Sequence, residues 1–264
     1  MKKILVFILI LSISTFAQDW KKFGSIFKGF SREFTAEEEK EIGKEVAAKL
    51  LGIYKLYKDK ELTHYVNLVG KYLGTFSDEP EREYTFAILD TDTINAYSCP
   101  GGYIFITLGL LENVSSEAEL AVVLAHEIAH ITEKHILKEI KRANILSEGT
   151  EILADKTTGG KGIGKELAKK LSQKAMETLL KKGLAKKDEY ESDRIGFEIA
   201  CKAGYNSKSF EEFLRKLDII TNQPGMTVLI KTHPTPDNRL KELKGKNCYS
   251  KNLLEERYKE RMKL

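Results

Sequence analysis

Hydrophobic and polar residues alternate along the chain with two different periods. The period found first along the chain, three to four residues, predicts helices. Apolar residues fall every three or four positions in residues 35–57 and again in residues 62–73, which is the spacing of a helix that buries one face. Thr35 followed by Glu38 forms a capping box at the start of the first of these helices. We therefore expect the chain beyond residue 35 to open with two amphipathic helices.

The period changes after Pro80. Residues 84–89 and 103–107 carry β-branched and alternating apolar side chains, which is typical of strands. Gly101 and Gly102 precede the second strand, and two adjacent glycines let another backbone approach closely, as at a sheet edge that accepts an extended peptide. An ordinary tight turn fits the same spacing. The pattern predicts a small sheet placed between helices.

A third helical pattern covers residues 120–138. Ser116 with Glu119 forms a capping box just ahead of its apolar positions. Helices with one small sheet predict an α+β fold that is mostly helical.

This third helix carries the sequence His-Glu-Ile-Ala-His. His126 and His130 are four residues apart, so they lie about 40° apart around the helix axis and one turn apart along it. Both imidazoles can then face one metal ion, with Glu127 placed as general base, as in the zinc motif His-Glu-x-x-His. The alternative is a chance match, since only three of the five positions are specified.

A catalytic zinc needs a third protein ligand. His135 follows His126 by nine residues, about 180° around a continuous helix, so we expect it to point away from the ion. Glu133 is roughly 10 Å from His126 along the axis, too far to bind the same ion. We expect a second helix at residues 187–196, on which Glu189 and Asp193 lie one turn apart. Glu189 can bind the ion while Asp193 accepts the outer N–H of a ligand histidine; a solvated acidic helix start is the alternative.

Composition and the N-terminus suggest an exported globular protein. The 264 residues are 42% hydrophobic, which is enough for a substantial core. Residues 1–17 have two lysines, a short apolar run and a small-x-small ending at Ala17, which predicts an export signal and a periplasmic location. An uncleaved signal anchor is the alternative reading. Removing Lys2 and Lys3 lowers the formal charge from +4 to +2, so nucleic acid is a poor partner.

Two further segments have an ambiguous pattern. Residues 18–34 place aromatic residues at helical spacing between basic ones, which fits a helix packed on the domain or peripheral contact with a membrane. Residues 156–187 are rich in lysine, as a solvated helix face is, and a mobile cover over the metal site is the second interpretation. The run at 159–165 resembles a phosphate loop, but Glu166 replaces the required Ser or Thr, so we expect no nucleotide.

The chain has three cysteines, Cys99, Cys201 and Cys248, with neither zinc-finger spacing nor the density of a disulfide framework. In an oxidising compartment one pair can bridge. We expect Cys201 to pair with Cys248 and Cys99 to stay free.

Four sequences in fixed order, NAYSCPGGYIFIT, HEIAH followed by TEKH, EYESDRIG and THPTPDNR, resemble the zinc metallopeptidase family that includes HtpX, BepA and the CAAX prenyl proteases. The resemblance covers about residues 35–245 and implies a zincin-like peptidase domain at 35–264 that binds one Zn²⁺. It implies His126, His130 and Glu189 as metal ligands, Glu127 as base and Asp193 behind a ligand. It also implies that His233 is a fourth ligand or an oxyanion donor, and that Gly101, Gly102 and Tyr103 lie along the substrate.

These features lead to the hypothesis of an exported zinc endopeptidase that hydrolyses unfolded or misassembled envelope proteins. A chaperone-like binding protein whose latent zinc site is closed by His233 is the alternative. A structural zinc protein is the third interpretation, and it requires four fixed protein ligands.

Overall fold

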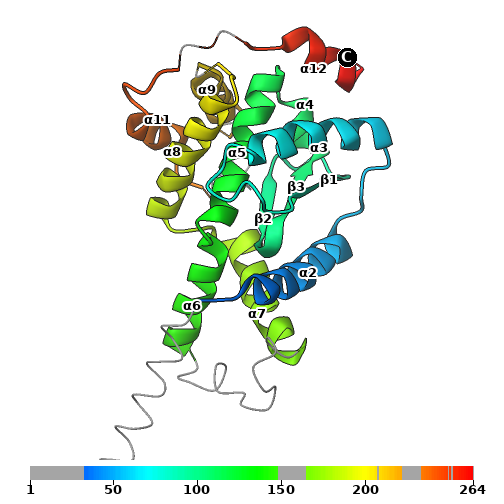
Figure 1. Ribbon diagram of the computed structural model, residues 1–264, viewed down its shortest axis with the longest axis vertical. Helices are drawn as coiled ribbons and strands as arrows, with labels where there is room; N and C mark the ends of the chain where they lie inside the picture. The colour runs from blue at the N-terminus through cyan, green and yellow to red at the C-terminus, as the bar shows by residue number, and fades with distance from the viewer. Residues whose placement is uncertain are drawn as a thin grey trace, which may run out of the picture.

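The computed structural model describes residues 33–147, 165–206, 208–221, 233–248, 250 and 252–263. The expected export signal at 1–17, nearly all of the segment at 18–34, and the glycine-rich run at 159–162 lie outside the described residues. Figure 1 shows helix α5 (Glu117–Thr132) running through the middle of the molecule, with α8 (Lys186–Lys202) on one side and the strands on the other.

The strands form one three-stranded sheet in the order β1-β3-β2. β1 (Thr85–Leu89) runs parallel to β3 (Tyr103–Thr107), whereas β2 (Ala96–Cys99) pairs antiparallel with β3. The strands expected at 84–89 and 103–107 are therefore confirmed. The sequence reading missed β2, because this four-residue strand runs directly into the short 3₁₀ turn η1 (Pro100–Gly102) and the whole stretch looked like a loop.

Helices cover both faces of this sheet. Phe86, Ile88, Ile104 and Ile106 lie in one hydrophobic core together with residues of α3 (Lys60–Gly74), α5 and α8. Phe105 belongs to a second core, because neighbouring residues of a strand point to opposite faces. That second core is completed by α2 (Ala36–Ile53), α6 (His135–Ser147) and α7 (Lys165–Glu177). The observed architecture is the α+β, mostly helical fold that the pattern predicts.

The remaining described elements close the ends of the domain. α4 (Leu108–Glu112) follows β3, and the π-helical turn η3 (Thr178–Lys182) joins α7 to α8. α9 (Lys208–Thr221), α11 (Pro236–Glu242) and α12 (Glu255–Met262) follow α8. A disulfide joins Cys201 of α8 to Cys248, and Cys99 is free and buried, so the expected pairing is confirmed.

Helix α2 begins with the expected capping box: the Thr35 hydroxyl accepts from the Glu38 N–H, and the Glu38 carboxylate accepts from the Thr35 N–H. It ends at Ile53 rather than near residue 57. The reason is a competing set of hydrogen bonds, since Tyr57 N–H donates to the Ile88 carbonyl and Asp90 N–H donates to the Lys55 carbonyl. The segment after α2 therefore runs along β1 instead of continuing the helix.

The lysine-rich α7 is amphipathic. Leu171, Ala175 and Met176 are buried in the second core, while Lys165, Lys169 and Lys170 are exposed. A solvated basic face accounts for the described part of this segment. Within the described residues, no helix combines the length and the apolar character needed to cross a membrane.

Candidate metal centre

Helix α5 supplies the two histidines. The Ser116 hydroxyl accepts from the Glu119 N–H and so caps the start of this helix. His126 and His130 follow, both buried, with their Nε2 atoms 2.9 Å apart and their rings nearly perpendicular at 85°. The expectation that both imidazoles can face one point is confirmed.

Helix α8 brings a carboxylate to the same point. The Glu189 Oε2 lies 3.6 Å from His126 Nε2, and its Oε1 lies 3.6 Å from His130 Nε2. Gly196 allows this close approach, because a Cβ atom at that position would lie 2.9 Å from the backbone nitrogen of His126. The small residue on α8 thus sets the spacing between the two ligand-bearing helices.

These distances fit a transition-metal ion. With metal–ligand bonds of about 2.0–2.2 Å in a tetrahedral site, neighbouring ligand atoms lie roughly 3.3–3.6 Å apart. The observed separations, 2.9 Å between the imidazoles and 3.6 Å from each imidazole to Glu189, bracket that range. Two imidazoles and one carboxylate are also a ligand set that catalytic zinc uses.

His233 lies at the same point. Its Nδ1 atom is 2.5 Å from Glu189 Oε2, and ligand atoms of His126, Glu189 and His233 all lie within 4.8 Å of one another. The side chain is partly exposed, unlike the other members. Burial alone raises the pKa of Glu189, but His233 and His130 outweigh it and hold that pKa well below its ordinary value.

Asp193 and Arg239 orient His126 from behind. The Asp193 Oδ1 lies 3.0 Å from His126 Nδ1, and its two oxygens accept from Arg239 at 2.9 Å and 2.5 Å. Burial raises the pKa of Asp193, but the Arg239 guanidinium outweighs it and holds that pKa below its ordinary value. Burial lowers the pKa of His126, yet hydrogen bonds to Asp193 and Glu189 raise it to about 9. The carboxylate therefore stays charged behind the ligand.

Arg239 was missed at the sequence level. It stands at the end of the THPTPDNR sequence and reaches Asp193 from α11, 46 residues further along the chain. Its role arises from tertiary packing, and no spacing rule within one helix could have found it. An arginine shortly after the His-Pro sequence was the available signal.

A second chain of hydrogen bonds lies behind His130, and it corrects the expectation for His135. Lys134 has a left-handed backbone (φ 55°), which ends α5 and starts α6 in a new direction. The Nδ1 atom of His135 consequently lies 2.9 Å from Nδ1 of His130, instead of pointing away. The expected continuous helix at 120–138 is wrong for this reason. Sequence reasoning missed the turn because Lys134 carries no glycine-like signal.

The protons of this chain follow from its geometry. His130 presents Nε2 to the ligand cluster, so its Nδ1 carries hydrogen and donates to His135 Nδ1 or to the Ser192 hydroxyl, 2.9 Å and 3.0 Å away. The Nε2 atom of His135 lies 3.1 Å from the Glu191 carboxylate, which is an acceptor, so His135 carries its hydrogen on Nε2 and accepts through Nδ1. Such a partner fixes the tautomer and orientation of a ligand histidine.

Glu127 faces two small cavities beside the ligands. One, of about 40 Å³, is lined mainly by apolar side chains of α5 and α9, and the other, of about 30 Å³, is lined by β2, η3 and Glu189. Both include Asn95, Ala96, Glu127 and His233. Burial raises the pKa of Glu127, against the opposing effect of His126 and His233. A carboxylate with a raised pKa next to a metal site suits proton transfer.

Gly101 and Gly102 pack closely against neighbouring backbone, and Gly101 also lines a small cavity together with His130. A Cβ atom on Gly101 would lie 2.8 Å from Cα of Lys40 in α2, and one on Gly102 would lie 2.3 Å from the Glu83 carbonyl oxygen. These glycines serve internal packing at positive φ. β3 is hydrogen-bonded on both sides, so it is not the sheet edge that accepts a peptide. The expected substrate contacts of Gly101, Gly102 and Tyr103 stay a prediction. β2 is the edge strand that reaches the Glu127 cavities.

A larger cavity lies away from this site, among the described residues. It measures about 810 Å³ and is lined by residues 51 and 54–59 with Asp90, among which there is no histidine. The donor set and its spacing, rather than cavity size, therefore identify the candidate centre.

Comparison with known proteins agrees with this geometry. The chain is 28% identical over 204 residues to a beta-barrel assembly-enhancing protease of Yersinia pestis, covering 72% of this chain and 40% of the relative. It is 27% identical over 220 residues to the protein of that name from Escherichia coli K12, covering 79% and 44%. A mitochondrial metalloendopeptidase OMA1 of Schizosaccharomyces pombe is 24% identical over 224 residues, covering 84% and 63%.

The chain thus spans less than half the length of the two assembly-enhancing proteases. The model of peptidase family M48 matches residues 60–247, which include all the ligand candidates. This chain belongs to peptidase family M48.

Proposed function

We propose that this protein is a zinc-dependent endopeptidase that cleaves unfolded or misassembled polypeptides of the cell envelope. The observation that carries the proposal is the convergence of His126, His130 and Glu189 at metal-ligand spacing, with Glu127 beside them. We propose that these ligands bind one catalytic Zn²⁺ per chain. A zinc ion held there supplies an acidified water and a Lewis acid for the scissile carbonyl.

The protein groups then have separate roles. Glu127 accepts the proton of the attacking water and passes it to the leaving amine, since a buried carboxylate with a raised pKa can both take and return a proton. His126 is held by Asp193 and Arg239, and His130 by His135 and Ser192. His233, at the rim of the ligand cluster, either binds the ion as a fourth ligand or donates to the oxyanion.

We propose that the substrate binds as an extended strand against β2. Among the described residues this strand pairs only with β3 and leaves its other edge to the cavities that Glu127 lines. Strand addition uses main-chain hydrogen bonds and therefore accepts many sequences, provided that the segment is unfolded. Val122, Val123, Phe210 and Phe213 line the larger of the two cavities, which favours an apolar side chain next to the scissile bond.

The envelope location rests on the export-like N-terminus and on the relatives named as beta-barrel assembly-enhancing proteases. Peripheral membrane contact through residues 18–34 is part of the same proposal. Nucleic acid and nucleotides are not expected partners.

The test is mass spectrometry of the products from a mixture of denatured proteins. We expect wild type to produce internal cleavages with apolar residues enriched next to the cut, and far fewer cleavages in the same proteins kept folded. Glu127→Gln keeps the side-chain volume and removes the base, so it should bind zinc and give no products. The control is Glu198→Gln, a half-exposed carboxylate of α8 paired with Arg194 and Lys246. Full cleavage by Glu127→Gln would refute the assignment.

The close contact between His233 and Glu189 favours a second candidate, a chaperone-like protein with a latent site. His233 Nδ1 and Glu189 Oε2 are 2.5 Å apart. Two ligands of one tetrahedral zinc lie roughly 3.3–3.6 Å apart, so these atoms must separate by about 1 Å before both can bind the ion. If His233 closes the site, His233→Ala gains peptidase activity. If His233 donates to the oxyanion, His233→Ala loses peptidase activity. In a separate assay, binding of unfolded clients that persists in Glu127→Gln would support the chaperone-like candidate.

A further inference from the structure

A second group of metal-ligand side chains lies on the outer side of His130. Glu133 caps the end of α5, His135 begins α6, and Glu191 belongs to α8. Ligand atoms of these three residues all lie within 4.8 Å of one another. The chemistry described above does not use Glu133, and it uses His135 and Glu191 only as successive partners behind His130.

The donor set suits a divalent transition metal. An imidazole nitrogen with two carboxylates is a ligand set found in zinc sites, where neighbouring ligand atoms lie about 3.3–3.6 Å apart. The Nε2 atom of His135 lies 3.1 Å from the Glu191 Oε2, which is near that spacing. The approach of two carboxylates is itself unfavourable, and a shared cation relieves their repulsion.

The three side chains differ in their exposure to solvent. His135 is fully buried, so its ring is fixed, whereas the side chains of Glu133 and Glu191 are 26% and 38% exposed. An ion can therefore arrive from solvent and meet a rigid imidazole. Lys138 is the nearby cation, 3.6 Å from Glu133, and its side chain is 44% exposed, so it can swing away when an ion takes its place.

We propose that Glu133, His135 and Glu191 form a second binding site for a divalent transition-metal ion such as Zn²⁺, and that filling this site loosens the ion held by His126, His130 and Glu189. The coupling part rests on the proposed function, because it concerns the same catalytic ion. The binding part stands on its own geometry.

The coupling follows from the position of one proton. In the arrangement described above, His135 carries hydrogen on Nε2 and accepts from His130 through Nδ1. An ion on Nε2 requires the proton to sit on Nδ1. The two Nδ1 atoms, 2.9 Å apart, would then both be donors, and the Ser192 hydroxyl would be the acceptor left for them. His130 thus loses His135 as an acceptor and competes with it for the Ser192 hydroxyl, so its orientation is held less firmly.

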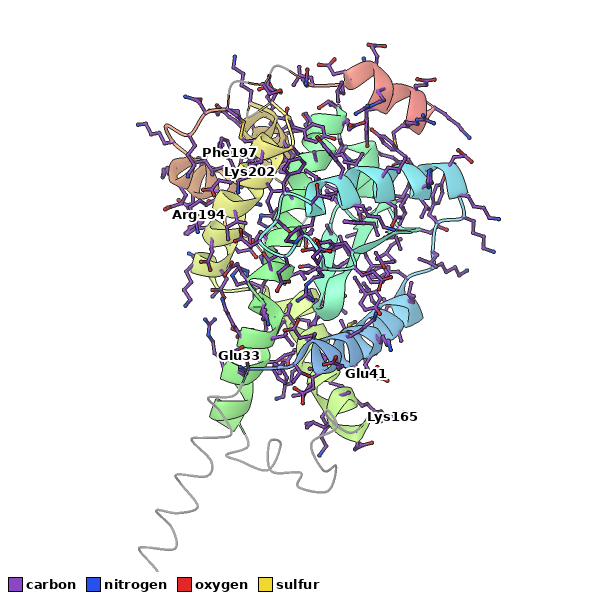
Figure 2. All side chains as sticks on the ribbon, viewed as in Figure 1. Glu33, Glu41, Lys165, Arg194, Phe197 and Lys202 are labelled. Carbon is purple, nitrogen blue, oxygen red and sulfur yellow. A yellow bond between two sulfur atoms is a disulfide. The ribbon has the colours of Figure 1, made fainter. Side chains whose placement is uncertain are left out.

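The first measurement is the number of ions per chain. Protein loaded with one equivalent of zinc is dialysed against increasing ZnCl₂, and bound zinc is counted by inductively coupled plasma mass spectrometry. We expect two ions per chain for wild type and one for the double variant Glu133→Gln/Glu191→Gln, whose substitutions keep side-chain volume. The matched control is Glu198→Gln, which should keep two ions. Glu198 pairs with Arg194 of α8, which Figure 2 shows on the side of that helix facing away from α5.

The second measurement is the release of the first ion. The catalytic ion is supplied as an isotopically enriched zinc, Co²⁺ is added in excess, and release of the enriched zinc is followed. Loss of an outer hydrogen-bond partner costs about 10–100-fold in metal affinity, so release should be about tenfold faster or more in wild type than in the double variant. Equal rates in the two proteins would refute the coupling.

A third variant separates this proposal from the proposed function. Glu189→Gln should lose the first ion and keep the second. A single ion that disappears in Glu189→Gln, or a second ion that persists in the double variant, would overturn the outer site. A single ion that disappears only in the double variant would instead support the outer site and contradict the catalytic one.

Discussion

Gly196 determines how closely α8 approaches α5, so Gly196→Ala tests the construction of the metal centre. An ideal Cβ at this position lies 2.9 Å from the backbone nitrogen of His126 and 3.0 Å from its Cα. Ordinary contacts between heavy atoms are about 3.5–4.0 Å, so α8 must move away by about 0.5–1 Å. Backbone atoms cannot rotate aside as a side chain can, and the movement therefore separates Glu189 from His126 and His130.

The expected effects are a modest loss of stability and a large loss of function. Overpacking of this kind costs about 1–3 kcal/mol, and the better helix propensity of alanine offsets about 1 kcal/mol of it. A displacement of about 1 Å at a catalytic centre can cost about 100-fold in rate. We therefore expect a net loss of about 1 kcal/mol in the free energy of unfolding, together with zinc affinity at least about tenfold weaker.

The assays are urea unfolding and competition for zinc with a chelator. Gly52→Ala is the matched control, because Gly52 also lies in a helix but a Cβ there meets nothing within 4 Å. That variant should be unchanged or more stable by up to about 1 kcal/mol. Equal stability and zinc affinity for the two variants would refute the argument that Gly196 sets the helix spacing.

Two further predictions concern groups outside the ligand set. Arg239→Ala leaves the buried Asp193 carboxylate without its cation, so urea unfolding should show a loss of about 3–5 kcal/mol in the free energy of unfolding. The control Arg215→Ala removes only an exposed pair with Glu211 and should cost under about 1 kcal/mol. Similar losses in the two variants would contradict this account. The disulfide between Cys201 and Cys248 closes a loop with a sequence separation of 47, so Cys201→Ser/Cys248→Ser should cost about 4 kcal/mol. Thiol titration of unfolded, unreduced wild type should find one free thiol, and three would contradict the pairing.

The sequence predicts the ligand set because every member lies at a spacing that one helix fixes. His126 and His130 are four residues apart on α5, and Glu189 and Asp193 are four apart on α8, so helical geometry alone aligns each pair. The two helices bring these pairs together only because Gly196 lets α8 approach α5 closely. The prediction that the pairs meet rests on the His-Glu-x-x-His motif and does not identify this glycine. The family resemblance added His233, which no local spacing identifies.

The missed features depend on tertiary packing or on short irregular turns. His135 turns back because Lys134 adopts a left-handed conformation, and a lysine gives no sign of this. Arg239 reaches Asp193 only after α11 folds against α8. β2 is four residues long and its pairing with β3 cannot be recognised from alternation in so short a stretch, so the sequence did not show that β3 is the central strand.

The central claim is that His126, His130 and Glu189 hold one zinc ion beside Glu127. The most direct measurement is anomalous diffraction at the zinc edge from crystals of protein loaded with one equivalent of zinc. We predict one peak about 2.0–2.2 Å from Nε2 of both histidines and from a Glu189 oxygen. A peak that lacks Glu189, or that lies away from both histidines, would contradict the claim.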